Sequence, residues 1–212
     1  MVQALTLTQF TAFTEKDYYI IDSRPAQIFA AGFIPGSVNM GLNGDIIKWA
    51  QAVLPQAVKC IVVAEDGQEE ETIAQLSKAG VKEIAGYLQY GFDAWVKAGE
   101  EIDLVITVEP DELIMDIPFD SQLQVVDVRT NAEFESGHLK NALNLPLEEM
   151  TDVAEIANFE ENQNLYIHSA INYRSMIAAS LLKKHGYHNL RQVTGGWDAI
   201  SKEEKAEVVK GV

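Results

Sequence analysis

The sequence has little of three things that many functional sites need: cysteine, histidine and positive charge. It contains one cysteine, Cys60, so no internal disulfide can form. With only four histidines beside it, the sequence offers few ligands for a clustered metal site. Lysine and arginine number 16 against 32 aspartates and glutamates, giving a net charge of -16. Such a surface repels phosphate backbones. We therefore expect no nucleic-acid partner and no bound metal.

Long apolar runs are also missing. No stretch approaches the roughly 20 residues that a membrane helix requires, so we expect no membrane partner. The N-terminal residues MVQALTLTQF lack a basic segment followed by a long apolar one, so we expect no signal peptide. With a single cysteine, these features predict a protein of the reducing cytoplasm. Hydrophobic residues make up 47% of the chain, which is enough for an ordinary globular core.

What the sequence does contain is an internal repeat. The stretch YYIIDSRPAQIFAAGFIPGSVNM matches LQVVDVRTNAEFESGHLKNALNL 105 positions later (127 − 22), and GFDAW later matches GWDAI at the same separation. Units of about a hundred residues suit independent domains better than solenoid repeats. We place the boundary in the polar stretch KAGEEIDLV and predict domains over residues 1–102 and 103–212.

Strand and helix signals alternate within each copy. In the second copy, apolar runs predict strands at 123–127 and 165–168, and apolar spacing predicts a helix at 174–185. The first copy repeats this pattern at 18–22, 60–63 and 72–79. The fold class is therefore α/β, with a parallel sheet in each domain and helices on both of its faces. The charged residues 201–210 predict a solvated final helix.

The stretch YIHSAINYRS, residues 166–175, predicts a strand, a tight loop and the start of a helix. The free N–H groups of a helix N-terminus and of a curled loop attract anions, and Arg174 adds a planar cationic donor. A cysteine at the start of this loop would have a lowered pKa and would be reactive. The residue there is Ser169, which needs an adjacent base to attack a substrate.

This loop resembles the rhodanese pattern H-C-x-x-G-x-R-S, and the repeated D-x-R, EFESGHLKNALNLP and GGWDAI stretches also resemble rhodanese signatures. The resemblance covers nearly the whole chain and implies two rhodanese-like domains. It implies a sulfurtransferase scaffold that carries sulfane sulfur as a cysteine persulfide, taken from a small sulfur anion such as thiosulfate or from a low-molecular-weight persulfide. No cofactor is implied. The family's nucleophile position falls on Ser169 and its loop arginine on Arg174.

The remaining loop residues implied to bind substrate are Ala170, Ile171, Asn172, Tyr173 and Ser175, with Asp127, Arg129 and His168 in support. Within the family, the two halves look most like the tandem part of persulfide dioxygenase–rhodanese fusion proteins. This resemblance implies a dioxygenase-domain partner or fusion, and the metal-binding motif H-x-H-x-D-H of that domain is absent from this sequence.

Two residues depart from the family pattern. Ser169 replaces the cysteine, so the chain as written is expected to be inactive, and Asn172 replaces a glycine that often has a positive φ angle. Three hypotheses stay open. The serine is an engineered or accidental change in a working enzyme, or the chain is a natural pseudo-rhodanese that binds anions, regulates or docks. The third, hydrolysis by Ser169, is disfavoured because no base is evident.

The matching loop of the first copy, Ala64-Glu-Asp-Gly-Gln-Glu-Glu-Glu, has neither cysteine nor arginine and is rich in acid. We expect that domain to be catalytically silent. Cys60 opens the apolar run CIVVA and is expected to be a buried structural residue. Asp127 and Arg129 have a structural interpretation beside the functional one, because Asp22 and Arg24 recur in the silent copy. Arg174 could likewise pair with a carboxylate instead of an anion.

Overall fold

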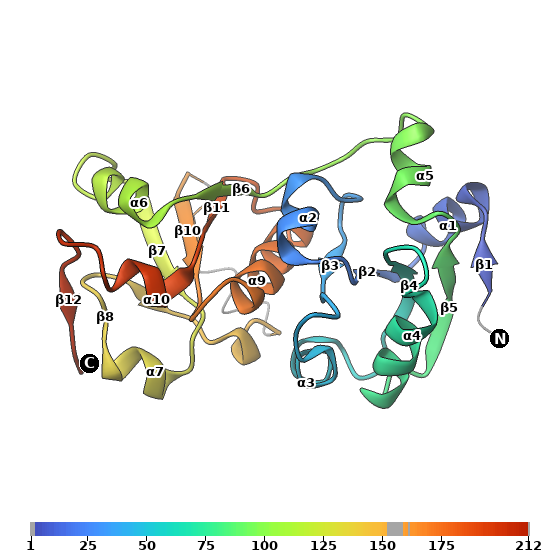
Figure 1. Cartoon of the computed structure of the whole chain (residues 1–212), viewed down its shortest axis with the longest axis horizontal. Helices are drawn as coiled ribbons and strands as arrows, with labels where there is room; N and C mark the ends of the chain where they lie inside the picture. Colours follow the sequence, from blue (N-terminus) through green and yellow to red (C-terminus); the bar gives the residue numbers. More distant parts are fainter. Residues whose placement is uncertain (1–2, 152–158, 161, 212) are drawn as a thin grey trace. The chain divides into compact units, whose positions relative to one another are not determined.

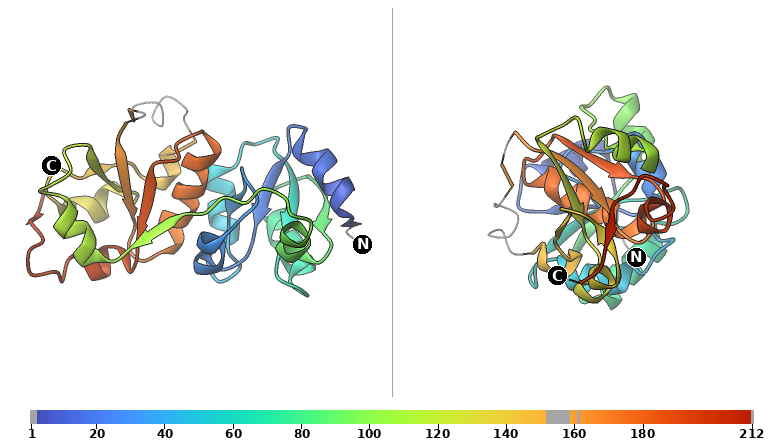
Figure 2. Two further views of the ribbon diagram at one scale, coloured as in Figure 1. Left: turned by 90° about the horizontal axis from the view of Figure 1, so that it is seen from above. Right: turned by 90° about the vertical axis from the view of Figure 1, so that its left-hand side faces the viewer.

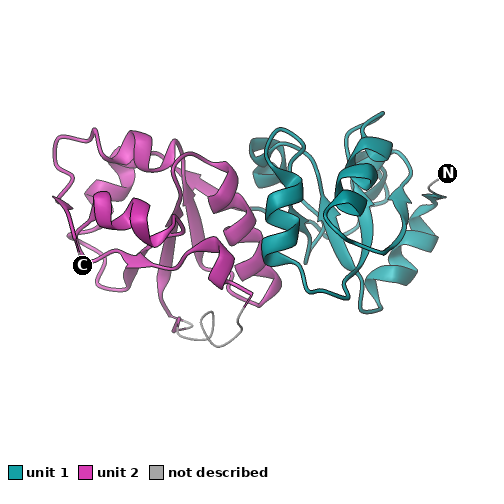
Figure 3. Cartoon of the chain, turned by 90° about the horizontal axis from the view of Figure 1, so that it is seen from below, with its two compact units in different colours: residues 1–104 teal, residues 105–212 magenta. Residues whose placement is uncertain are grey.

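The computed structural model describes residues 3–151, 159–160 and 162–211. The chain divides into two compact units, unit 1 over residues 1–104 and unit 2 over residues 105–212 (Figure 3). Each unit contains a five-stranded parallel sheet with helices packed against it (Figure 1). The α/β class predicted from the alternating strand and helix signals is confirmed.

The sheet of unit 1 has the strand order β1-β5-β4-β2-β3. Its strands are β1 (Ala4–Leu5), β2 (Tyr19–Asp22), β3 (Val38–Asn39), β4 (Lys59–Val63) and β5 (Glu83–Leu88). Its helices are α1 (Leu7–Thr14), α2 (Ala26–Ala31), α3 (Ile46–Val53), α4 (Glu69–Lys78) and α5 (Gly91–Lys97).

The sheet of unit 2 has the equivalent order β6-β11-β10-β7-β9. Its strands are β6 (Ile106–Val108), β7 (Leu123–Asp127), β9 (Leu143–Asn144), β10 (Asn164–His168) and β11 (Leu190–Val193), and β8 (His138–Leu139) pairs separately with β12 (Val208–Val209). Among the described residues, its helices are α6 (Pro110–Asp116), α7 (Asn131–Ser136), the 3₁₀ helix η1 (Leu147–Glu149), α9 (Tyr173–Lys184) and α10 (Gly196–Ile200).

Alternation along the strands supplies both faces of each sheet with apolar side chains. In unit 2, Val125 and Tyr166 belong to a buried cluster that also contains Leu113 of α6 and Ile200 of α10. Their strand neighbours point to the opposite face, where α9 packs against β10 and β11. Figure 1 and the left view of Figure 2 both show α6 and α9 on opposite sides of this sheet. Burial of each such side chain contributes roughly 1.5–3 kcal/mol relative to exposure.

Unit 1 is built in the same way. Phe10 of α1 and Trp95 of α5 pack with Ile20, Ile61 and Leu88 on one face of the sheet. The intervening residues of β4 point to the other face, against which α4 packs. None of the helices among the residues that the structure describes has the length and apolar character needed to cross a membrane.

The predicted helix over residues 201–210 is wrong. This segment consists of turns followed by β12, whose Val208 and Val209 pair antiparallel with β8. An ion pair between Lys140 and Glu207, 2.7 Å long, lies beside this pairing. Two adjacent β-branched residues and a neighbouring strand edge outweigh the helix propensity of the preceding charged residues.

Candidate active site

The candidate loop follows β10 at the carboxyl edge of the sheet of unit 2. His168, the last residue of β10, lies opposite Asp127 of β7, which in turn lies opposite Asn144 of β9. Three strands therefore end at the same level, and residues 169–172 connect this edge to α9. The sheet thus brings the D-x-R motif and the loop together, as expected for ligand sites in parallel α/β folds.

Ser169 stands at the base of the loop and is only 1% exposed. Its hydroxyl donates to the carbonyl of Ile171 at 3.3 Å and accepts from the amide of Ser175 at 3.3 Å. Ser175 lies in the first turn of α9, whose free N–H groups carry partial positive charge. Position 169 therefore faces the positive end of a helix.

The amides of Ala170, Ile171 and Asn172 make no hydrogen bond within the part of the chain that the structure describes. Ile171 is 59% exposed, so this stretch of the loop borders solvent. Unpaired loop amides beside a helix N-terminus can receive an anion. The half-buried Tyr173 opens α9, and the buried hydroxyl of Ser175 donates to the carbonyl of Asn172 at 2.9 Å.

Helix α10 holds the opposite side of the loop. The amide of Trp197 donates to the carbonyl of Ser169 at 2.7 Å, and the amide of Asp198 donates to that of Ala170 at 3.1 Å. Gly196 has φ +55, and a Cβ there would lie 2.4 Å from the carbonyl oxygens of Ser169 and Ile171. The loop thus packs directly on the GGWDAI stretch, because Gly196 has no side chain and lets the two backbones come into contact.

Arg174 does not point freely into the loop. Its guanidinium forms a bidentate ion pair with Glu133 of α7, at 2.7 and 2.8 Å. This contact lowers the pKa of Glu133 to about 2 and raises that of Arg174. The Glu133 carboxylate also accepts from the amide and hydroxyl of Thr130, the N-cap of α7. Of the two interpretations of Arg174, pairing with a carboxylate is the geometry observed.

Asp127 and Arg129 form a closed module beneath the loop. Arg129 donates to the Asp127 carboxylate at 2.6 and 3.0 Å and to the carbonyl of Gly137 at 2.8 Å. Its guanidinium also stacks over Trp197, 4.5 Å from the ring centroid. Asp22 and Arg24 repeat the same contacts in unit 1. This repetition supports a structural role. Arg129 packs against Trp197 of α10, and the amide of Trp197 in turn donates to the loop.

His168 is fully buried and faces this module instead of Ser169. Its Nε2 lies 3.7 Å from Asp127 Oδ2, and burial lowers its pKa below the ordinary range. Its Nδ1 lies 3.4 Å from the backbone oxygen of Ser169, not from the hydroxyl. Among the described residues, no basic side chain therefore hydrogen-bonds to the Ser169 hydroxyl.

Asn172 departs from the expectation attached to the missing glycine. Its φ is −117 and its ψ −26, so the loop of unit 2 needs no positive φ at this position. Sequence reasoning also overlooked two residues that contact the loop, Glu133 and Gln192. A signal for Gln192 existed, since it is a polar residue that shares a strand face with the apolar Leu190, two positions earlier.

The matching loop of unit 1 lacks these features. Ala64 stands at the position of Ser169 and Glu69 at that of Arg174, each 105 residues earlier (169 − 64). The backbone contact is kept, since a Cβ on Gly91 would lie 2.6 Å from the carbonyl oxygen of Ala64. The architecture is therefore repeated in both units, whereas the polar chemistry of the loop is not.

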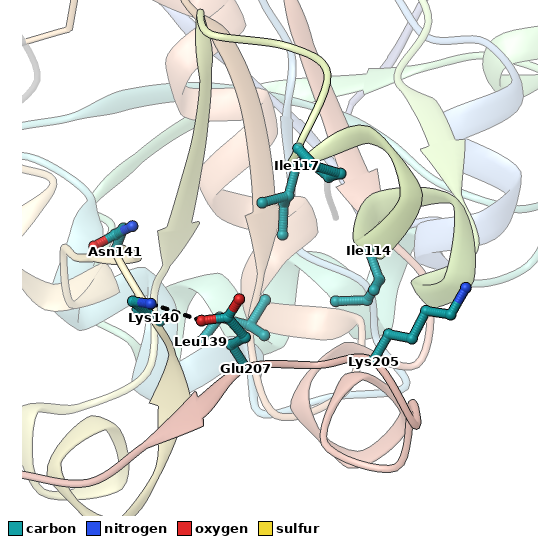
Figure 4. Close-up of a pocket in the computed structure, with 8 residues that line it drawn as sticks. Ile114, Ile117, Leu139, Lys140, Asn141, Lys205 and Glu207 are labelled. Carbon is teal, nitrogen blue, oxygen red and sulfur yellow. Dashed lines mark hydrogen bonds and ion pairs between the residues drawn. The ribbon is translucent and has the colours of Figure 1, made fainter.

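Two other features of the molecule lie apart from the loop. Burial raises the pKa of the Cys60 thiol, in β4, to about 12, which keeps it protonated and unreactive. A cavity of about 270 Å³ in unit 2 shares no residue with the loop (Figure 4). It is lined by Ile114, Ile117, Pro118, Leu139, Lys140, Asn141, Lys205 and Glu207. Within the described ranges, no group of acidic, histidine or cysteine side chains could hold a metal ion.

Comparison with known proteins supplies a family. The model of the Rhodanese-like domain matches residues 6–98 and again 109–203. A putative sulfur carrier protein of Bacillus subtilis is 34% identical over 77 residues, which cover 36% of this chain and 40% of that protein. A tRNA uridine(34) hydroxylase of Leptospira interrogans is 38% identical over 77 residues, covering 34% of this chain and 21% of that protein.

A putative mitochondrial thiosulfate sulfurtransferase of Schizosaccharomyces pombe is 29% identical over 91 residues, which cover 37% of this chain and 63% of that protein. The chain thus spans between 21% and 63% of the length of these curated relatives. Among solved structures, a thiosulfate sulfurtransferase from Pseudomonas aeruginosa aligns over the whole chain and 44% of its own. The identity is 16% and the TM-score 0.44.

Proposed function

The chain belongs to the rhodanese-like domain family, and from this premise we propose that unit 2 is a sulfurtransferase-type domain whose nucleophile position is Ser169. Its ligand is a small sulfur anion or a low-molecular-weight persulfide, and it needs no cofactor. Because a serine cannot carry sulfane sulfur, the chain as written does not turn over.

The observation that carries this proposal is the placing of Ser169. The hydroxyl is buried against the amide of Ser175 at the N-terminal end of α9. It lies next to the amides of residues 170–172, which make no hydrogen bond to any residue that the structure describes. A thiolate in this place would be stabilised by the same groups, which also suit the negative charge of a sulfur anion. The amides of Trp197 and Asp198 in α10 donate to the carbonyls of Ser169 and Ala170, and these hydrogen bonds keep the loop in place.

With a thiol at position 169, the reaction has two steps. The thiolate attacks the outer sulfur of thiosulfate, a new S–S bond forms, and the old S–S bond breaks with its electron pair leaving on sulfite. Cyanide or a cellular thiolate then attacks the outer sulfur of the persulfide and regenerates the thiolate. The loop amides stabilise the charge that moves between these groups.

Serine blocks the first step for two reasons. Its hydroxyl stays protonated at neutral pH, and activation would need a base within hydrogen-bonding distance. The partners of the Ser169 hydroxyl in the described residues are the carbonyl of Ile171 and the amide and hydroxyl of Ser175. His168, the nearest basic residue in sequence, faces Asp127. The hydrolase hypothesis therefore has no structural support.

Unit 1 is proposed to be catalytically silent. Its loop has Ala64 at the nucleophile position, followed by Glu65 and Asp66, whose carboxylates repel an anion. Its repeated Asp22–Arg24 module preserves the fold without the chemistry. A dioxygenase-domain partner or fusion remains part of the proposal, on the resemblance of the two halves to the tandem part of persulfide dioxygenase–rhodanese fusion proteins.

A second candidate is a natural pseudo-rhodanese that binds an anion or docks a partner without reacting. The ion pair of Arg174 with Glu133 favours it, because this contact engages the loop's cation. The same residues serve both candidates, and they differ in whether a thiol alone restores turnover. The name of the tRNA hydroxylase relative does not extend to this chain, whose net charge of -16 disfavours RNA.

The test is thiosulfate-dependent thiocyanate formation by the chain as written and by Ser169→Cys. We expect no activity above background for the serine form and turnover for Ser169→Cys. A folded but silent Ser169→Cys, tried with thiosulfate and with a low-molecular-weight persulfide, would reject the sulfurtransferase proposal in favour of the binding module.

A further inference from the structure

The loops of the two units have different backbone φ angles at one pair of matching positions, Gly67 and Asn172. Gly67 in unit 1 has φ +81, a left-handed conformation that favours glycine. Asn172 stands at the matching position in unit 2 (172 − 67 = 105) and has φ −117. Asn172 therefore does not adopt the left-handed conformation of Gly67. The backbone of the loop runs differently in unit 2, and other contacts must stabilise that conformation.

The side chain of Asn172 supplies this support. Its Oδ1 accepts from the amide of Gly195 at 2.8 Å and from Nε2 of Gln192 at 3.1 Å. The Gly195 amide can only donate, which fixes the orientation of the asparagine. The loop is thus tied to the residues that join β11 to α10.

Gln192 extends the contact to the nucleophile position. It is 2% exposed, and its Nε2 also lies 3.1 Å from the hydroxyl of Ser175. The amide of Ser175 donates in turn to the Ser169 hydroxyl. One buried amide group therefore touches Asn172 at the end of the loop and Ser175 in α9, which bonds to Ser169 at the start of the loop. Unit 1 has Tyr87 at the position of Gln192 (192 − 87 = 105), so the arrangement is confined to the unit with the candidate site.

We propose that Asn172 and Gln192 are positioning residues, which together with the Gly195 amide form a clamp that shapes the loop for an anion before it binds. A loop that is already ordered loses less conformational freedom on binding, so the clamp strengthens the binding of the donor. This inference rests on the proposed function for its role in sulfur transfer, whereas the clamp itself is a property of the loop.

The first test follows hydrogen exchange of the Gly195 amide in the chain as written. Asn172→Gly and Gln192→Leu each remove part of the clamp, and a hydrogen bond of ordinary strength predicts exchange faster by about threefold to tenfold. Asn172→Asp keeps an acceptor and should retain the protection. Gln124→Leu is the matched control, since Gln124 also donates to backbone carbonyls from a strand but does not touch the loop. Unchanged exchange in Asn172→Gly would overturn the clamp.

The second test repeats these variants in the Ser169→Cys background and separates KM from kcat. We expect Asn172→Gly to raise KM for thiosulfate by about threefold to tenfold, with a smaller change in kcat. Faster exchange with an unchanged KM would overturn the role in donor binding. If Ser169→Cys itself fails to turn over, the proposed function fails, and the exchange experiment still decides whether the clamp exists.

Discussion

At the scale of single residues, the loop depends on side chains that lie far from it in the sequence. Glu133 is 41 residues from Arg174, and Gln192 is 20 residues from Asn172. The sequence identified the loop, because strand, polar turn and helix are consecutive. It could not identify these partners, since only the folded sheet brings α7 and β11 to the loop. A comparison of the two copies does indicate the ion pair. Unit 1 has Glu69 in place of Arg174 and Ile28 in place of Glu133, so both partners are replaced together.

The ion pair gives a pH-dependent prediction. The pKa of Glu133 is lowered from 4.5 to about 2, chiefly by its hydrogen bond with Arg174. A carboxylate with a lowered folded-state pKa stabilises the fold fully above its unfolded pKa, and this contribution is lost as pH falls through the folded value. We therefore expect Glu133→Gln to reduce the loss of stability between about pH 4.5 and 2, as measured by urea unfolding at several pH values.

Glu135→Gln is the control for this experiment, because Glu135 is exposed on the same helix. It should keep the pH dependence of the unmodified chain. Equal slopes for Glu133→Gln and Glu135→Gln would show that the pair with Arg174 contributes nothing to stability in acid. The carboxylate of Glu133 is partly exposed, so its contribution should shrink at high salt.

At the scale of elements, the predicted strands and central helix of unit 2 were confirmed closely. The strand predicted at 123–127 is β7, and the helix predicted at 174–185 is α9, which begins at Tyr173 and ends at Lys184. Periodic apolar residues carry this information locally. The final segment was mispredicted because its conformation is set by pairing with β8, a contact that spans about seventy residues of chain.

The close approach of α10 to the loop predicts a large cost for Gly196→Ala. A positive φ costs an alanine about 1–2 kcal/mol, and the contact with three carbonyl oxygens, those of residues 169–171, adds roughly 1–3 kcal/mol. Gly186→Ala is the matched control, since Gly186 has φ +92 but open space around it. Urea unfolding should show a clearly greater loss for Gly196→Ala. Equal losses would mean that the loop does not rest on α10.

At the scale of the whole molecule, one fold is present twice with different surfaces at the equivalent edge. Both sheets have the same strand order, and both contain the Asp–Arg module. The sequence repeat predicted this duplication, because the spacing of 105 residues holds both for the D-x-R stretches and for the GFDAW and GWDAI stretches. What the repeat could not reveal is how differently the two loops run, since φ at Gly67 and Asn172 depends on contacts within each unit.

This duplication allows a matched experiment with two thiols. Ala64→Cys and Ser169→Cys place a cysteine at equivalent positions of the two loops. We expect Ser169→Cys to have a thiol pKa below the ordinary value of about 8.5, because it faces the start of α9. The thiol of Ala64→Cys should have a raised pKa, because Ala64 is buried and followed by acidic residues. The rate of alkylation as a function of pH measures both, and similar values would contradict the asymmetry between the units.

The most direct test of the central claim is the intact mass of three proteins after exposure to thiosulfate: the chain as written, Ala64→Cys and Ser169→Cys. The account predicts that Ser169→Cys alone gains one sulfur atom, which cyanide then removes. A sulfur gained by the chain as written would place the chemistry at Cys60, and one gained by Ala64→Cys would show that unit 1 is not silent. No gain by a folded Ser169→Cys, with thiosulfate or with a low-molecular-weight persulfide as donor, would contradict a sulfurtransferase loop in unit 2.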